Sequence, residues 1–296
     1  MSAKRTHWHG YLFVAPATVY LVVFSLVPMA VAAYLSLYHW PLLGKERWFV
    51  GLANYAQALG DPFFRGAFWN TVVFAALAVP LGMVSSLAVA VLVNQRLRGV
   101  TVFRTLYYVP AVSSGVAVSM VWIWIFLPHD GLINTVLKWL GGAGDVDFLG
   151  DPSLALPALV LMSLWMGLGP RMVIFLAGLQ GIPQSLYESA EIDGAGPWQR
   201  FRHITLPMLV PTTFFVLVTS TISALQLFTQ VYVMTKGGPR RATDVVVYHI
   251  YKEAWHKFAI GSASAQSYIL LAVIVAISVF QFRLMRRRLR EAAEQW

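Results

Sequence analysis

Six long apolar segments constrain this chain more than any other feature. About 20 mostly apolar residues are needed to cross a bilayer as an α-helix, and six segments approach or exceed that length. They cover about 11–37, 69–93, 106–127, 154–179, 208–234 and 267–282. Strands of a membrane barrel would alternate polar and apolar residues, and these segments do not. The sequence therefore predicts an all-α integral membrane protein with six transmembrane helices, organised as a single domain over residues 1–296.

The composition supports a bilayer rather than water as the main surroundings. Only 12% of the residues are charged and 58% are hydrophobic, whereas soluble domains carry about 25% charged residues. This excludes intrinsic disorder, and the absence of cysteine excludes a disulfide scaffold. The net charge of +9 does not indicate nucleic-acid binding, because the basic residues lie between apolar segments. The first segment is too long for the apolar core of a signal peptide, so we expect a retained helix.

The basic residues predict the orientation. Arg96, Arg98 and Arg104 lie in the second connection, and five arginines lie in the tail after residue 282. Cytoplasmic loops are enriched in Lys and Arg, so we expect both termini in the cytoplasm. The fifth connection does not fit this rule. With six spans and a cytoplasmic N-terminus it lies outside, yet it is rich in basic residues: Lys236, Arg240, Arg241, Lys252 and Lys257.

The fourth connection, 183–207, contains signals for two short helices. Pro183 suits a helix start, and Gly194 suits a sharp stop. Pro197 can begin a second helix that ends before Pro207. We expect a compact cytoplasmic hairpin beside the membrane.

This hairpin carries the family resemblance. Residues 188–195 read Glu-Ser-Ala-Glu-Ile-Asp-Gly-Ala, followed by Phe201, Ile204, Leu206 and Pro207. The pattern resembles the EAA signature of binding-protein-dependent ABC importer permeases, with Ser189 where the signature usually has alanine. Three further segments resemble carbohydrate-type members of the family: 176–183, 235–239 and 51–55.

The resemblance implies a function and a set of partners. The hairpin would be a coupling helix that docks on a separate ATPase subunit, with Glu188, Ser189, Ala190, Asp193, Gly194 and Ala195 as the contacting residues. A second homologous permease, two ATPases and an extracytoplasmic binding protein would complete a transporter in a bacterial-type cytoplasmic membrane. The sequence lacks a G-x-x-x-x-G-K-[ST] phosphate loop. We therefore expect no enzyme activity and no cofactor in this chain, with ATP and Mg held by the partners.

The fifth apolar segment is the most polar. Thr219, Ser223, Gln226 and Gln230 would share one face of a continuous helix, with Ser220 beside them. Such a face could line a water-filled pathway and bind the hydroxyl groups of a sugar. Hydrogen bonding between membrane helices would enrich the same residue types.

Arg171 is the one charged residue well inside an apolar segment. A buried membrane charge usually faces a cavity or a partner, so Arg171 is a second candidate for the substrate pathway, with structural pairing as the alternative. Trp165 could stack on a sugar, but packing in the core or at an interface is the simpler interpretation. His249, Glu253 and His256 have helical spacing that could hold zinc, although a solvated face against a partner is the simpler interpretation. We expect no metal site.

Rival functions remain at this point. The stretches 263–267 and 281–283 also resemble glycerol-3-phosphate permeases, and Arg171 would suit a phosphate. A self-sufficient secondary transporter should have carboxylates inside its spans, and every Asp and Glu of this chain lies outside them. A membrane-embedded hydrolase would need a catalytic set that is not evident. The sequence favours an importer permease for a sugar or oligosaccharide that works by alternating access.

Overall fold

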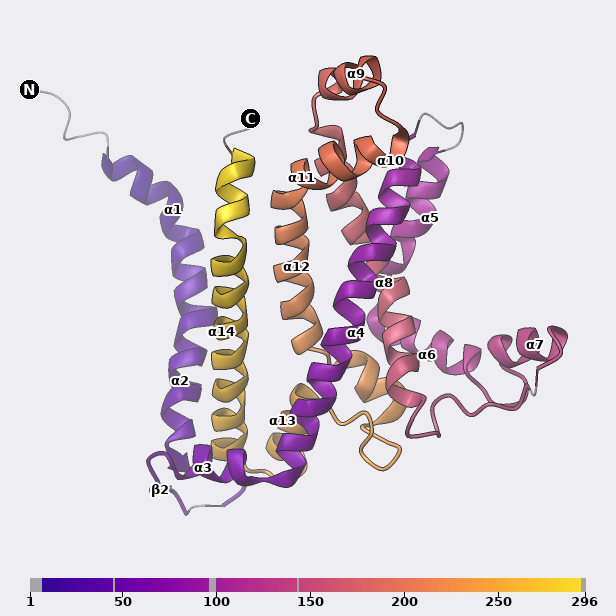
Figure 1. Cartoon of the computed structure of the whole chain (residues 1–296). Coiled ribbons are helices and arrows are strands. Elements are labelled where there is room, and N and C mark those ends of the chain that lie inside the picture. Colours follow the sequence, from indigo (N-terminus) through magenta and orange to yellow (C-terminus); the bar gives the residue numbers. More distant parts are fainter. Residues whose placement is uncertain (1–6, 45, 96–99, 143, 294–296) are drawn as a thin grey trace, which may run out of the picture. The chain divides into compact units, whose positions relative to one another are not determined.

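A computed structural model describes residues 7–44, 46–95, 100–142 and 144–293. Helices dominate this part of the chain, as Figure 1 shows, so the all-α class is confirmed. The α-helices are α1 (His7–Leu21), α2 (Val27–Ser36), α3 (Ala53–Gly60), α4 (Pro62–Val93), α5 (Val100–Val112), α6 (Gly115–Ile125), α7 (Leu132–Trp139), α8 (Ala155–Gln180), α9 (Gln184–Ile192), α10 (Pro197–Arg200), α11 (Leu206–Met208), α12 (Val210–Leu225), α13 (Val246–Trp255) and α14 (Ile260–Ala293). The other elements are three π-helical turns, η1 (Val22–Leu26), η2 (Phe201–Thr205) and η3 (Val231–Thr235), and two strands, β1 (Tyr38–His39) and β2 (Trp48–Phe49).

Four of the described helices are long and apolar enough to cross a membrane. They are Tyr11–Ser36, Pro62–Val93, Ala155–Gln180 and Ile260–Arg286. Two bent pairs bring the number to six if each pair is one span: Val102–Val112 with Gly115–Ile125, and Pro197–Met208 with Val210–Leu225. The predicted count of six thus corresponds to four continuous helices and two bent pairs.

Two of the predicted spans, 106–127 and 208–234, contain bends. The first bends by 102° between α5 and α6, where Ser114 has an extended ψ of 126°. The second bends by 65° before α12, where Pro211 lacks the backbone N–H that would continue the helical ladder. Its helix then ends at Leu225 rather than near residue 234. Hydropathy detects apolar runs but not these local backbone departures.

One compact unit comprises Met1–Phe64 and Ile250–Ala272. Within it, α1, η1 and α2 form a long apolar helix whose side chains from Tyr11 onward are almost all exposed. Strand β1 pairs with β2 in antiparallel register, Tyr38 opposite Phe49. The buried amide of Asn54 donates to the carbonyl oxygens of Ser36 and Tyr38 at 2.8 and 2.9 Å. These bonds fix the end of the first span to the connection that follows it.

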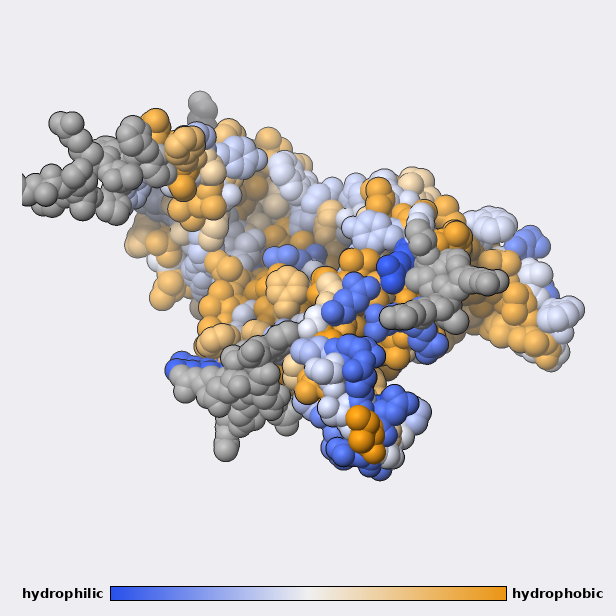
Figure 2. Space-filling view, turned by 90° about the horizontal axis from the view of Figure 1, so that it is seen from above, coloured by the Kyte–Doolittle hydropathy of each residue, from blue (hydrophilic) through white to orange (hydrophobic). Residues whose placement is uncertain are grey.

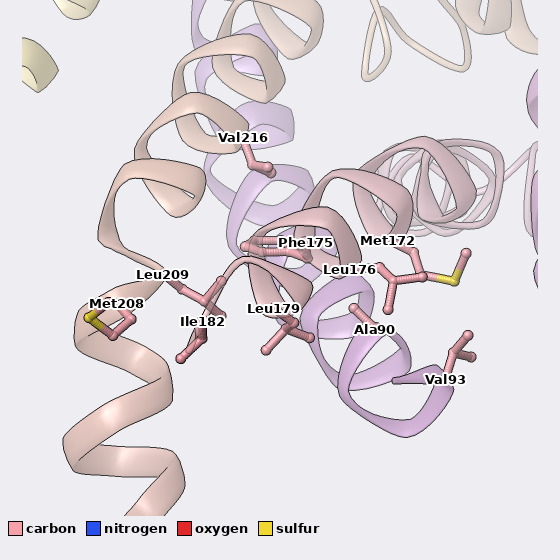
Figure 3. Close-up of a cluster of buried hydrophobic side chains, with 10 residues drawn as sticks. All are labelled: Ala90, Val93, Met172, Phe175, Leu176, Leu179, Ile182, Met208, Leu209 and Val216. Carbon is pink, nitrogen blue, oxygen red and sulfur yellow. The ribbon is translucent and has the colours of Figure 1, made fainter. Parts of the chain in front are cut away.

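The second unit comprises Arg65–His249 and Val273–Trp296. Its hydrophobic core gathers side chains from α4, α8, α11 and α12, with Phe175 near the centre of the cluster in Figure 3. In lipid, such packing stabilises the fold mainly through van der Waals contact. The buried members are Ala90, Val93, Met172, Phe175, Leu176, Leu179, Ile182, Met208, Leu209 and Val216.

Small residues let α8 approach its neighbours closely. A Cβ at Gly169 would overlap the backbone carbonyl of Tyr107 on α5, and a Cβ at Gly178 would lie 2.5 Å from Thr212 Oγ1 on α12. Such small-residue contacts are typical of membrane helix pairs. They place α8 in close contact with both α5 and α12.

Candidate functional site

The hairpin at 183–207 forms largely as its sequence predicts. Helix α9 ends at Ile192, and Gly194 adopts a φ of +79° that side chains with a Cβ resist. The turn closes with hydrogen bonds from Ala195 N to Ala190 O at 2.8 Å and from Asp193 N to Ser189 O at 3.0 Å. Pro197 begins α10 as expected, but the chain then continues helically through Pro207 to Met208. The predicted end before Pro207 is therefore wrong, because η2 and α11 extend the second arm toward the membrane.

Two side-chain contacts brace the two arms of this hairpin, and a third caps the second arm. Tyr187 Oη and Thr205 Oγ1 lie 2.9 Å apart, and Arg200 Nη1 pairs with Glu191 Oε2 at 3.3 Å. At the start of α10, the Gln199 side chain accepts a hydrogen bond from Gly196 N at 2.8 Å. The hairpin is therefore a braced unit rather than a loose loop.

A recess of about 370 Å³ lies between the arms. Four of the six predicted coupling residues line it, together with the second arm: Ala190, Asp193, Gly194, Ala195, Gln199, Arg200, His203 and Ile204. Glu188 and Ser189, the other two, are exposed outside this recess. The structure thus gathers the predicted residues at one exposed tip, while their docking on an ATPase stays a prediction.

The tip also carries apolar side chains that the sequence analysis missed. Ile192 is 87% exposed and Trp198 is 68% exposed. Figure 2 looks onto this end of the chain and shows a hydrophilic projection with a hydrophobic spot at its tip. Exposed large side chains on a rigid projection are typical of a protein contact surface. The signal in the sequence was two large apolar residues flanking the Gly194 turn.

A second feature is a cavity of about 440 Å³ walled by α4, α5, α8 and α12. Most of its lining is apolar, from Phe74 and Ala78 on α4 to Leu227. The polar side chains that line it are Ser163, Arg171, Thr219, Ser220, Ser223 and Gln230. An apolar wall with a few convergent polar groups is typical of a small-molecule site.

Arg171 occupies a niche in this cavity that two glycines create. A Cβ at Gly82 would lie 2.8 Å from Arg171 Nη2, and a Cβ at Gly167 would lie 2.5 Å from Nη1. The guanidinium donates from Nε to buried Ser86 Oγ and from Nη2 to Leu164 O, both at 3.3 Å. The structure gives Nη1 no hydrogen-bond partner among the described residues. The charge is therefore held in place with donors left over for a ligand.

The polar stripe of the fifth segment meets the cavity only in part. Thr219 and Ser223, one helical turn apart on α12, line it with Ser220, and Gln230 lines it from beyond the helix end. Gln226 is exposed at the C-cap of α12 and is not among the lining residues. The prediction that all four share one helical face is wrong, because the helix ends at Leu225 and the following residues change direction.

Hydrogen bonds within α12 and between helices also involve its polar side chains. Thr219 Oγ1 donates to the carbonyl of Phe215 at 2.8 Å in its own helix. Gln281 Nε2 donates to Thr221 Oγ1 at 2.9 Å, so this pair links α14 to α12 within the second unit. Ser163 differs, because its buried Oγ lines the cavity and has no partner among the described residues. The sequence analysis missed Ser163, a single serine in an apolar run.

The two remaining candidates, Trp165 and the group of His249, Glu253 and His256, make packing and ion-pair contacts with other residues of the chain. Trp165 packs edge-on against Trp122, with ring centroids 5.8 Å apart, and does not line the cavity. His249 is buried with its Nδ1 3.3 Å from Asp244 Oδ2, so the expected solvated face is wrong at this residue. Glu253 pairs with Lys257 at 2.6 Å. Among the described residues, no three His, Asp or Glu side chains gather as a metal site.

The helical membrane fold, the braced hairpin and the polar cavity together define a membrane-embedded transport subunit. The family model of the binding-protein-dependent transport system inner membrane component matches residues 78–291. The chain belongs to this family.

Three relatives cover nearly the whole chain. The sn-glycerol-3-phosphate transport system permease protein UgpA of Yersinia pestis bv. Antiqua (strain Antiqua) is 35% identical over 284 residues, 96% of each protein. The probable ABC transporter permease protein YesP of Bacillus subtilis (strain 168) is 35% identical over 95% of this chain and 92% of its own. A chain of a bacterial ABC transporter involved in the import of the acidic polysaccharide alginate is 26% identical, with a TM-score of 0.82 over 95% of this chain and 96% of its own. The importer-permease prediction is therefore confirmed at the level of the family.

Proposed function

We propose that this chain is a transmembrane permease subunit of an ATP-driven importer for a sugar, an oligosaccharide or a related polyol. The observation that carries the proposal is the cavity, in which hydroxyl, amide and guanidinium groups converge within an apolar wall. Hydroxyl-rich ligands need such convergent hydrogen-bonding groups. The names of the relatives agree in kind, since they include a glycerol-phosphate system and an importer of a polysaccharide.

Transport would proceed by alternating access. An extracytoplasmic binding protein delivers the substrate, and closure of two ATPase subunits on ATP moves the hairpins of this chain and of a second, homologous permease. The cavity then opens toward the outside and accepts the substrate. ATP and Mg bind to the ATPases, and this chain hydrolyses nothing itself. The exposed tip with Ile192, Trp198 and the Glu188–Ala195 segment is the surface that would transmit the motion.

The proposal also assigns an orientation. The hairpin and both termini lie in the cytoplasm, and the 130–151 connection lies outside, in the cytoplasmic (inner) membrane of a bacterial-type cell. Helices α4, α13 and α14 each run from one compact unit into the other. The two units would therefore act as one transmembrane permease domain over residues 1–296.

ATP-dependent uptake tests the class of transporter. The chain, purified with its partner subunits and binding protein, is reconstituted in vesicles and supplied with a panel of labelled sugars and polyols. We expect uptake only when ATP is inside with the ATPases. Uptake by this chain alone, driven by an ion gradient without ATPases, would identify a secondary transporter instead.

A second candidate, an importer of a polyol phosphate such as glycerol 3-phosphate, is favoured by Arg171. A cation inside a membrane segment costs roughly 2.5–3.5 kcal/mol on insertion scales, and the Gly82 and Gly167 niche keeps this one at the cavity wall. Hydrogen bonds to a charged group contribute roughly 1.5–3 kcal/mol. An anionic group beside Nη1 would offset the burial of the guanidinium.

A matched ligand pair separates the two substrate classes. Arg171→Met keeps an elongated side chain and removes the charge. If the substrate is anionic, uptake affinity for a phosphorylated polyol should fall roughly 10- to 150-fold, while the unphosphorylated compound is unaffected. If the substrate is neutral, both ligands should respond alike. Co-purification with the partner subunits controls for assembly.

A further inference from the structure

Helix α7, between α6 and α8, exposes a continuous apolar face. Leu132, Val136, Trp139 and Leu140 lie at positions i, i+4, i+7 and i+8 and therefore share one side of the helix. All four are exposed, and Trp139 is 86% exposed. Four large apolar side chains on one side of a two-turn helix, none covered by the chain itself, need surroundings other than water.

Three charged or titratable side chains lie near this face: Lys138 on the other side of the helix, His129 in the turn before it and Asp145 in the loop after it. Lys138 Nζ and His129 Nδ1 both contact Asp145 Oδ1, at 3.0 and 3.1 Å. The hydrogen bond from Lys138, with a smaller one from His129, lowers the pKa of the Asp145 carboxyl below its ordinary value. All three side chains are about half exposed or more. This side of α7 therefore requires water or lipid headgroups.

The segment that carries α7 is built rigidly. The fully buried amide of Asn134 donates to the carbonyl oxygens of Leu127 and Val146 at 2.8 and 2.9 Å, and its Oδ1 accepts from Val146 N at 3.0 Å. A Cβ at Gly131 would lie 2.7 Å from backbone atoms of Ile125 and Leu127. These contacts hold the segment that carries the apolar face.

We propose that α7 is an interfacial helix that lies in the membrane surface opposite the coupling hairpin, with its apolar face toward lipid acyl chains. Helix α8 is a full membrane span, so α7 and α9 at its two ends belong to opposite surfaces. An apolar face with Trp next to an exposed charged face is the pattern of helices that lie in the headgroup region. The headgroup region satisfies both sides of α7 at once.

Two observations favour lipid over a protein partner as the occupant. The preceding helix α6 also exposes large apolar side chains, Met120, Val121 and Trp124, as expected of a chain segment that lies against lipid. Lys138 lies on the side of the helix away from the apolar face, so the headgroup region can solvate its ion pair with Asp145 while the apolar face contacts acyl chains. In Figures 1 and 2, α7 lies at the edge of the second unit, where hydrophobic and hydrophilic surfaces adjoin.

Spin labels can test this placement directly, since the chain has no cysteine of its own. Single cysteines replace Val136 and Leu140 on the apolar face, and Asp147 in the following loop provides an exposed control. The labelled chain is reconstituted with its partner subunits in vesicles of phosphatidylethanolamine and phosphatidylglycerol. Collision with oxygen, which concentrates in acyl chains, is compared with collision with a water-soluble nickel chelate.

We expect labels at 136 and 140 to collide mostly with oxygen and the label at 147 mostly with nickel. Labels at 136 and 140 that collide mostly with nickel would place the face in water and overturn the proposal. Labels at 136 and 140 that are immobilised and shielded from both reagents would mean that a protein partner covers the face, which also overturns it. Two polar substitutions that keep the helix provide a further check: Val136→Thr is combined with a label at 140, and Leu140→Gln with a label at 136. In each case the label should collide less with oxygen and more with nickel, which burial under a protein partner would not produce.

Discussion

Two glycines on α8, Gly167 and Gly169, face different kinds of neighbour, so alanine at each should have a different consequence. At Gly167, the new Cβ would lie 2.5 Å from Arg171 Nη1, and the guanidinium must move by about 1 Å to reach ordinary van der Waals contact. That shift exceeds what its two 3.3 Å hydrogen bonds can absorb. Because a flexible side chain moves rather than the backbone, we expect altered substrate use with little loss of stability.

At Gly169, the obstacle is the backbone of α5. The Cβ would overlap the carbonyl of Tyr107 and lie 2.9 Å from the Cα of Tyr108, and neither atom can rotate away. Overpacking of this kind costs about 1–3 kcal/mol, and the gain in helix propensity offsets only about 0.5–1 kcal/mol of it. Gly169→Ala should therefore destabilise the chain by up to about 2 kcal/mol and separate α5 from α8.

Gly66 supplies the matched control. It also lies inside a membrane helix, α4, and a Cβ there meets nothing within 4 Å. Gly66→Ala should keep or raise stability, by about 0.5–1 kcal/mol at most. The three variants are compared by the apparent melting temperature of the detergent-solubilised transporter and by ATP-driven uptake. If Gly169→Ala has the same melting temperature as Gly66→Ala and transports normally, the close contact between α5 and α8 is refuted. If Gly167→Ala binds the substrate with normal affinity, a ligand role for the Arg171 niche is refuted.

Other regions of the chain yield further predictions. A cysteine at Ser153 should react with an impermeant thiol reagent in intact cells, whereas one at Ser185 should not; the reverse pattern would overturn the orientation. Ile192→Asp should weaken co-purification with the ATPases without loss of membrane insertion, and unchanged co-purification would remove the tip from the docking surface. The pKa of Asp145 is lowered in the folded chain, so its contribution to stability is fully present above the ordinary value of 3.8 and is lost as the pH falls below it. The difference in melting temperature between the wild type and Asp145→Asn should accordingly shrink in acid, and a difference that grows there would contradict the Lys138 pair.

Local sequence was sufficient for the long helices and for the hairpin. Apolar runs identify membrane helices because each helix satisfies its own backbone hydrogen bonds in lipid. The glycine at 194 and the proline at 197 determine the hairpin through backbone conformations that few other residues favour. These features depend on residues that are close in sequence.

The site could be predicted only in part, because its geometry depends on distant residues. The niche of Arg171 needs Gly82 and Ser86, which lie on α4. The end of α12 at Leu225 moves Gln226 out of the cavity although its spacing is ideal for the helical face. The helical spacing of His249 with two other polar residues predicts a solvated face, but His249 is buried beside Asp244. Helix α7 escaped notice because its apolar residues are too few to register as a span.

If the Gly194 turn couples ATP hydrolysis to transport, as proposed, valine at two glycines with the same backbone conformation should have different consequences. Gly194 and Gly141 have φ values of +79° and +81°, and a Cβ at either would meet nothing within 4 Å. Valine at either position therefore carries a similar backbone cost, of roughly 1–2 kcal/mol or more, but only Gly194 lies in the hairpin.

Uptake and ATP hydrolysis are measured on the same reconstituted vesicles, with Glu188→Lys as a second hairpin variant that reverses a charge at the docking surface. We expect Gly194→Val and Glu188→Lys to insert normally but to lose uptake and substrate-stimulated hydrolysis, whereas Gly141→Val retains both. Equal uptake and hydrolysis in Gly194→Val and Gly141→Val would contradict the proposed coupling.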